Sequence, residues 1–269
     1  MSAWLPAAPC TPRACVRGTV PGAGPVRAVL RLVGVLVLVA AGVALLPCGG
    51  RVPARLVRRW CRWIVRAAGV RVRLRGAAAP VGGLLLVAPH VSWLDVPLLA
   101  AVRPARLVAK AEIRHWPLAG PLAARGGVLF LDRDRLRTLP DTVGRITEVL
   151  RGGGAVGVFP EGSTWCGPER GSFRRAVFQA ALDAGCPVQP VAIRYAGPRG
   201  TTVTAAAFVG DDTLVRSVWR VVSARGLVAE VEVPAPLTSG PVTDRRALAR
   251  AAQRAVGDPA DRRRPGGPG

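Results

Sequence analysis

A histidine and an aspartate stand five positions apart in the segment HVSWLD, residues 90–95. The segment follows the apolar run GLLLVA, and catalytic groups of open α/β sheets lie just beyond the carboxyl ends of such strands. If His90 lies in the turn and Asp95 in the first turn of a helix over 92–102, the carboxylate can orient the imidazole as a general base. Alternatively, Ser92 and Asp95 only form a capping box at the start of that helix, and His90 is a loop residue.

Basic side chains follow two other predicted strands. Lys110 is the only lysine among 38 basic residues, which favours a compact ammonium at that position and a contact with an anion. Arg133 follows the second of these strands, and its guanidinium can bind a phosphate through two parallel hydrogen bonds. The structural alternatives are a surface lysine at 110 and an ion pair between Arg133 and Asp132 or Asp134.

A fourth polar block, Glu161-Gly162-Ser163-Thr164, follows the predicted strand 155–159. Glu161 can accept hydrogen bonds from hydroxyls, and Gly162 would let a substrate approach the backbone. The alternative is an ordinary turn between a strand and a helix. Since parallel strands end at one edge of a sheet, we expect the four blocks to meet there. Signatures of nucleotide-phosphate loops, dinucleotide-binding folds and nucleophile-elbow hydrolases are absent from the sequence.

The elements that must position these groups alternate along the chain. Short apolar runs predict strands over 71–75, 83–88, 107–109, 128–131, 155–159, 188–194, 203–209 and 228–233. Helical periodicity fits 92–102, 118–124, 139–151, 173–184, 212–224 and 243–255. Because several runs are apolar throughout, both faces of the sheet should be covered. The pattern predicts an α/β fold, a central and mostly parallel sheet flanked by helices on both faces, preceded by an N-terminal helical membrane-anchoring hairpin.

The N-terminal third of the sequence predicts the membrane anchor. Thirteen arginines and no acidic residue occur before Asp95, in a chain of net charge +22 with 50% hydrophobic residues. The apolar run 32–46 would form a helix of about 22 Å, short of the roughly 30 Å hydrocarbon core of a bilayer. A secretory signal peptide is the competing interpretation, but no cleavage motif of small residues follows the run.

A helix over 51–66 would gather its arginines in one stripe and its apolar side chains on the opposite face. The arginines are Arg51, Arg55, Arg58, Arg59, Arg62 and Arg66, and the apolar residues are Leu56, Val57, Trp60, Trp63 and Ile64. This arrangement is typical of a helix in a membrane interface, and the alternative is a surface helix whose apolar face packs on the core. We expect a hairpin that dips into one leaflet of the cell membrane from the cytoplasmic face.

Composition divides the chain into a disordered leader (1–27), a membrane-associated hairpin (28–69), an α/β domain (70–256) and a disordered tail (257–269). The six cysteines form no CxxC motif and no Cys/His cluster, so no metal site is expected. They are interpreted as unpaired small hydrophobic residues in a reducing compartment. Nucleic-acid binding is disfavoured because the basic excess surrounds an apolar run and aromatic residues make up only 5% of the chain.

The segments HVSWLD, KAEI…PLAG, GVLFLDR and FPEGST, followed by the stretch 188–191, resemble in this order the successive blocks of the glycerolipid acyltransferases. The resemblance extends over 55–235 and is nearest to the bacterial lysophosphatidic acid acyltransferases. It implies that His90 is the general base and that Asp95 orients it. It also implies that Arg133 binds the acceptor phosphate and that Glu161 and Gly162 help to bind the acceptor. We extend these last two roles to neighbouring polar residues, namely Lys110 for the phosphate and Ser163 and Thr164 for the acceptor.

The resemblance implies an enzyme that moves a fatty acyl group from acyl-CoA or acyl carrier protein to the free hydroxyl of a lysophospholipid. The first expectation for the acceptor is 1-acyl-sn-glycerol-3-phosphate, which would give phosphatidic acid. His90 would take the hydroxyl proton during direct attack on the thioester, and Lys110 or nearby backbone N–H groups would stabilise the oxyanion, with no metal or cofactor. The expected partners are membrane lipids and the two substrates.

Two alternatives remain open at this point. The acceptor could be another lysolipid, such as lyso-ornithine lipid. The chain could also be a non-catalytic basic membrane-binding protein, although the intact pair of His90 and Asp95 argues against that class.

Overall fold

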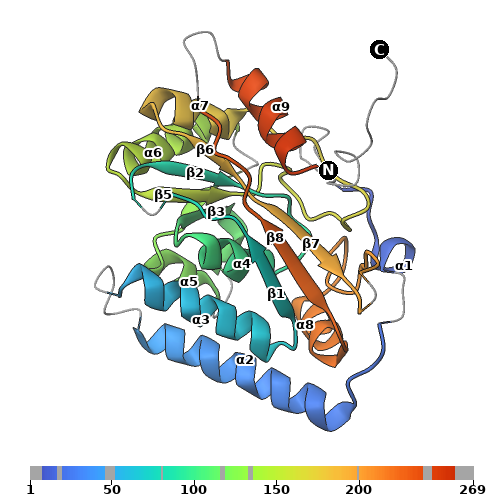
Figure 1. Ribbon diagram of the computed structural model, residues 1–269. Helices are drawn as coiled ribbons and strands as arrows, with labels where there is room; N and C mark the ends of the chain where they lie inside the picture. The colour runs from blue at the N-terminus through green and yellow to red at the C-terminus, as the bar shows by residue number, and fades with distance from the viewer. Residues whose placement is uncertain are drawn as a thin grey trace, which may run out of the picture.

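Five parallel strands form the central sheet of the protein in a computed structural model (Figure 1). The structure describes residues 8–16, 20–45, 52–79, 81–115, 119–132, 136–198, 200–238 and 244–257. The order of the strands is β4-β3-β5-β2-β6, with bounds Leu129–Leu131, Arg106–Lys110, Ala155–Val158, Leu84–Val87 and Val188–Pro190. Every neighbouring pair runs parallel, so the five carboxyl ends lie along one edge of the sheet.

A second sheet has the order β1-β8-β7, with bounds Arg71–Arg75, Val228–Glu232 and Ala192–Ala196. β1 is parallel to β8, and β7 is antiparallel to it. The predicted strand 188–194 is therefore divided between the two sheets. The break falls at Val191, whose N–H donates to Val87 O at 2.9 Å. Pro190 just before it has no N–H, and β6 is the edge strand of the central sheet, where proline is tolerated.

The predicted strand 203–209 is wrong. Its apolar residues are largely buried, but they form turns that connect β7 to the next helix. The Arg220 guanidinium donates to Ala205 O at 2.9 Å and also to Ala207 O, so a side chain satisfies carbonyls that a strand would have paired. A buried connection and a buried strand have the same apolar composition, and periodicity does not separate them.

Helices cover both faces of the central sheet, which confirms the predicted fold class. α4 (Asp95–Val102) covers one face, and α6 (Leu139–Arg151), α7 (Ala176–Ala184) and α9 (Arg245–Ala255) cover the other. The remaining helices of the domain are α5 (Ala119–Arg125) and α8 (Leu214–Ser223), with 3₁₀ turns at Ala111–His115 and Leu136–Thr138. Alternate residues of β2 enter two different cores. Leu84 and Leu86 pack with residues of α4, whereas Leu85 and Val87 pack with residues of α6, α7 and α9. Burial on both faces explains why this strand is apolar throughout.

A helical hairpin of α2 (Pro25–Leu45) and α3 (Ala54–Ala67) lies along one side of the α/β domain (Figure 1). The Trp60 indole N–H donates to Leu38 O at 2.9 Å and so joins the two helices. A Cβ at Gly42 would lie 2.1 Å from the Trp60 ring, so this close approach requires glycine. The N-terminal half of α2 is fixed to the domain by Arg31, which donates to Val222 O at 2.9 Å and to Ala224 O at 2.6 Å.

The predicted faces of α3 need correction. Cys61, Ile64 and Val65 are buried where α3 packs on α4 and β1, as the alternative interpretation of this helix required. Trp60 is half-buried and bonds α2 through its indole N–H. Trp63 does not oppose the arginines, because the Arg59 guanidinium lies 5.0 Å from its ring centroid on the exposed side. The other arginines predicted for the membrane divide into exposed Arg55 and Arg66, half-buried Arg58 and Arg62, and Arg51, which lies outside the described residues.

Much of the predicted disordered leader is packed against the domain. Residues 8–16 include the short helix α1, Pro12–Cys15, and the buried Cys10. Gly22 forms a β-bridge with Ala224, and the Arg225 N–H donates to Pro21 O at 2.7 Å. The expectation of disorder is therefore wrong for residues 8–16 and 20–27, whereas 1–7, 17–19 and the predicted tail beyond Gly257 lie outside the described residues.

Candidate active site

His90 and Asp95 form a hydrogen-bonded pair just beyond the carboxyl end of β2. His90 Nδ1 lies 3.0 Å from Asp95 Oδ2, and the carboxylate is fully buried while the imidazole is partly open to solvent. An ionised carboxylate only accepts hydrogen bonds, so this contact places a proton on Nδ1. Nε2 is then the nitrogen that can take a proton from a bound hydroxyl. The predicted pairing of the two side chains is confirmed.

Four hydrogen bonds fix the Asp95 carboxylate. Besides His90, Oδ2 accepts the backbone N–H groups of Val91 and Ser92, both at 2.7 Å. Oδ1 accepts the hydroxyl of Tyr195 at 2.5 Å. Burial and the adjacent carboxylate raise the pKa of Tyr195 well above its ordinary value, which keeps the phenol a donor. The interactions of a capping box are also present just before α4, which begins at Asp95: Ser92 Oγ accepts the Leu94 N–H at 3.3 Å, while the Asp95 carboxylate accepts the Ser92 N–H.

Glu161 connects the histidine turn to the loop that follows β5. Its Oε2 accepts the backbone N–H of His90 at 2.8 Å, and its Oε1 accepts that of Gly171 at 3.2 Å. The carboxyl group is buried, and this desolvation raises its pKa to about 7 against the lowering effect of the two N–H groups and Arg170. Oε2 thus positions the backbone of His90, and Oε1 ties the loop at Gly171 to the same carboxyl group. Contact of Glu161 with an acceptor stays a prediction.

The loop after Glu161 packs closely around the histidine. Phe159 stacks on His90 with ring centroids 4.2 Å apart and planes inclined by 16°. The backbone N–H of Trp165 donates to His90 O at 2.7 Å. The Trp165 indole lies so close to Gly171 that a Cβ there would be 2.5 Å from the indole nitrogen. Gly162 has φ +80 in the turn closed by its N–H to Phe159 O, a conformation that favours glycine. These contacts fix the ring plane and the backbone of His90.

Some polar atoms of this region are buried without a hydrogen-bond partner. Within the described residues they include Ser163 Oγ, Trp93 Nε1 and Trp165 Nε1, which belong to segments flanking His90. Leaving such groups unpaired is costly, so they are groups that a substrate or water could satisfy. This agrees with the expectation that Ser163 contacts an acceptor. Thr164 is half-buried in the same loop.

The two predicted anion-binding residues belong to strands farther along the sheet. Lys110 ends β3, two strand positions from β2, which corresponds to about 10 Å at the usual strand spacing. Arg133 lies outside the described residues; β4, the strand before it in the sequence, is three positions from β2, or about 14 Å at the usual strand spacing. Within the described residues, His90, Lys110 and Glu161 therefore start from one sheet edge, with Lys110 displaced to one side of the histidine.

Comparison with known proteins identifies the family. A model of the Acyltransferase family matches residues 69–194, which include His90, Asp95 and Glu161. The chain is 38% identical over 243 residues to a lyso-ornithine lipid O-acyltransferase of Pseudomonas aeruginosa, covering 86% of this chain and 92% of that protein. It is 36% identical to a 1-acyl-sn-glycerol-3-phosphate acyltransferase of Neisseria gonorrhoeae, covering 65% and 68% of the two chains. The chain belongs to the acyltransferase family.

A solved structure supports the architecture. The crystal structure of the 1-acyl-sn-glycerophosphate acyltransferase from Thermotoga maritima is similar with a TM-score of 0.57, over 86% of this chain and 94% of that one. The two sequences are 18% identical, so this likeness concerns the fold alone. It extends the agreement beyond the residues that the family model matches.

Tyr195 and Phe159 are the two site residues that the sequence analysis missed. Tyr195 comes from β7 in the second sheet, 100 residues from Asp95 along the chain. Its one sequence signal is that it is the only tyrosine in the protein. Phe159 could have been found, because it stands immediately before the polar block in FPEGST, where a strand directs its last side chain toward the sheet edge.

Proposed function

We propose that this acyltransferase transfers a fatty acyl group from an acyl thioester to the hydroxyl of a lysolipid, with His90 as the general base. The observation that carries the proposal is the contact of His90 Nδ1 with the buried Asp95 carboxylate, which leaves Nε2 as the proton acceptor. A hydroxyl is too weakly acidic to attack a thioester unaided at neutral pH. A positioned base supplies about 10²–10⁴-fold in rate.

The proton and electron pairs can be followed through the reaction. The hydroxyl gives its proton to His90 Nε2 while its oxygen bonds to the thioester carbonyl carbon. Asp95 stabilises the resulting imidazolium through Nδ1–H. When the tetrahedral intermediate collapses, the carbon–sulfur bond breaks and the thiolate takes the proton back from Nε2. The products are the acylated lipid and a free thiol, such as that of coenzyme A or acyl carrier protein, and the imidazole is regenerated.

For the acceptor we favour lyso-ornithine lipid, in place of the 1-acyl-sn-glycerol-3-phosphate expected first from the sequence. Relatives named for that activity align with most of this chain in Pseudomonas aeruginosa and with 66% of it in Rhizobium meliloti. The glycerophosphate acceptor is the second candidate, favoured by relatives such as that of Neisseria gonorrhoeae and by Arg133 in the segment LFLDR. An ornithine head group offers a carboxylate where the glycerolipid offers a phosphate, and a guanidinium binds either.

Membrane association would bring the site to its lipid substrates. α2 has 21 residues and is apolar enough to cross a membrane, and little of it is buried. Its exposed large apolar residues are Val26, Val29, Leu30, Val33, Leu36, Val37, Val39, Val43 and Leu45. Arg31 of α2 bonds Val222 O of the domain, and Trp60 of α3 bonds Leu38 O of α2, so α2 is held alongside the domain. We therefore propose that α2 lies in one leaflet rather than crossing the bilayer.

α8 would extend this membrane surface, because it packs against α2 and also exposes apolar side chains. Val215 is 79% exposed and Trp219 45% exposed. Replacing both with serine should weaken binding to neutral vesicles without changing turnover of a short-chain soluble acceptor. Unchanged binding to the vesicles would show that α8 stays in water.

A competition assay tests the acceptor. Purified protein receives acyl-CoA or acyl carrier protein thioester with equal amounts of lyso-ornithine lipid and 1-acyl-sn-glycerol-3-phosphate, and mass spectrometry measures the two products. We expect the ornithine lipid to form faster, and His90→Ala to form neither product. Faster formation of phosphatidic acid would favour the second candidate, and equal inactivity on both acceptors would contradict the proposal.

A further inference from the structure

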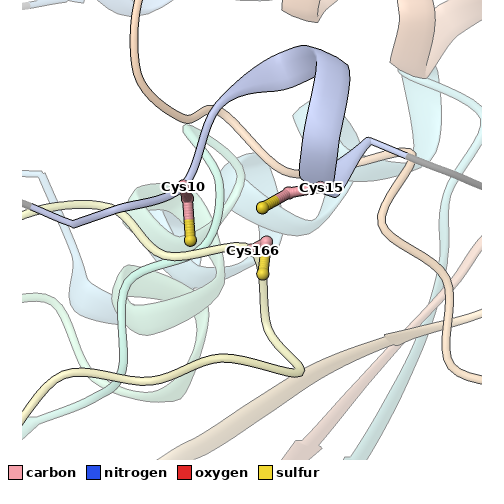
Figure 2. A group of neighbouring side chains, drawn as sticks. All are labelled: Cys10, Cys15 and Cys166. Atoms are coloured by element: carbon pink, nitrogen blue, oxygen red, sulfur yellow. The ribbon is translucent and has the colours of Figure 1, made fainter.

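Three cysteines meet beside the candidate site although the sequence places them in two distant segments. Cys10 precedes α1, Cys15 ends it, and Cys166 lies in the loop that follows Glu161 (Figure 2). Their Sγ atoms all lie within 4.8 Å of one another. Cys10 is 2% exposed and Cys166 3% exposed, whereas Cys15 is half-buried. Each carries a free thiol, as expected from the sequence, but the sequence analysis did not predict that the three meet.

The spacing of the sulfur atoms is close to that of thiolates around one metal ion. Zinc–sulfur bonds of about 2.3 Å place the sulfurs of a tetrahedral site about 3.8 Å apart. The longest separation here would need to shorten by no more than about 1 Å. A donor set made only of thiolates selects soft or borderline cations over magnesium or calcium.

We propose that Cys10, Cys15 and Cys166 bind a thiophilic divalent cation such as Zn²⁺. Three thiols become three thiolates, so binding releases three protons, and water or another external ligand completes the coordination on the half-buried side of Cys15. Protons compete with the cation for each of the three thiolates. Zinc affinity should therefore fall as the pH is lowered.

An occupied site would link the N-terminal segment to the loop beside the catalytic pair. The neighbour of Cys166, Trp165, donates its backbone N–H to His90 O. On the other side, the segment carrying Cys10 sits against Gly210, where a Cβ would lie 2.9 Å from Cys10 O. Gly210 also has φ +61, so both its conformation and this close approach favour glycine. The cation would hold together two segments that already pack closely.

Metal binding is tested with the full chain, purified with a phosphine reductant and a chelator and then transferred to buffer without chelator. We expect one equivalent of Zn²⁺ to bind, and Co²⁺ to give a thiolate-to-cobalt charge-transfer band. Removing a residue that only hydrogen-bonds a metal ligand costs about 10–100-fold in metal affinity. Cys10→Ser and Cys15→Ser each remove a ligand itself, so each should lower zinc affinity by more than that. Cys186→Ser removes a buried free thiol outside the cluster and should bind zinc as the wild type does.

A second measurement separates loss of a ligand from loss of folding. The thermal midpoint of the wild type and of Cys186→Ser should rise with free Zn²⁺, and that of Cys15→Ser should not, with all three showing the same circular dichroism. Absence of zinc uptake by the wild type, or unchanged uptake by Cys15→Ser, would overturn the proposal. A disulfide between two of the three cysteines in protein kept under reductant would also overturn it.

Discussion

The phenol hydroxyl of Tyr195 can be removed without changing the shape of the side chain, in Tyr195→Phe. This change leaves Asp95 Oδ1 buried without the donor that now lies at 2.5 Å. Hydrogen bonds to charged groups contribute about 1.5–3 kcal/mol. At roughly 2–4 °C per kcal/mol for a chain of this size, the thermal midpoint should fall by about 3–12 °C. Turnover should fall by about tenfold or less, since Oδ2 keeps its three donors and still faces His90.

The assay is thermal unfolding followed by circular dichroism, with turnover on a lysolipid measured on the same preparations. Thr147→Val is the matched control, because it removes a buried hydroxyl that bonds only Val143 O within α6. It should change the midpoint less and leave turnover intact. If Tyr195→Phe unfolds at the wild-type temperature, Asp95 does not depend on the phenol. If it loses as much turnover as His90→Ala, Tyr195 takes part in the chemistry rather than positioning the carboxylate.

Three further variants test the acceptor site, the buried acid and the membrane surface. Arg133→Ala should weaken a phosphorylated acceptor by about 10–150-fold, measured as KM, with little effect on the acyl donor; equal losses for both would indicate a structural role. Burial raises the pKa of Glu161 from 4.5 to about 7, so between these pH values the folded protein holds a proton that the unfolded chain releases. The free energy of unfolding should therefore fall as the pH rises from about 4.5 to about 7. Glu161→Gln should flatten this dependence of the unfolding free energy on pH, measured by denaturant titration at several pH values. An unchanged pH dependence would refute the raised pKa of Glu161. Replacing exposed Arg55, Arg59 and Arg66 with Gln should cost about 3 kcal/mol, or roughly 150-fold, in binding to anionic vesicles and little on neutral ones; equal loss on both would contradict an electrostatic role.

The sequence predicted those parts of the site that depend on local spacing. His90 and Asp95 are five residues apart, so one turn at the end of a strand is sufficient to join them. The arrangement of the polar blocks along one edge followed from the alternation of strands and helices, because parallel strands end together. These inferences required the order of the elements but no knowledge of their packing.

The contacts that the sequence did not predict all join distant segments. Tyr195 reaches Asp95 because the chain leaves the central sheet after Pro190 and enters a second sheet, a change that apolar composition does not reveal. Cys10 packs beside Cys166 although its segment has no hydrophobic periodicity, since tertiary contacts rather than local propensity stabilise it. α3 illustrates the same limit, because amphipathicity defines an apolar face but not whether a membrane or α4 covers it.

The most direct test of the catalytic account is the rate of acyl transfer by His90→Ala. Purified variant and wild type receive the same acyl thioester and lysolipid in vesicles, and mass spectrometry follows product formation under single-turnover conditions. The account predicts a loss of at least about 10²–10⁴-fold with vesicle binding unchanged, since the base is removed and the membrane surface is not. Turnover near that of the wild type would contradict the assignment of His90 as the base.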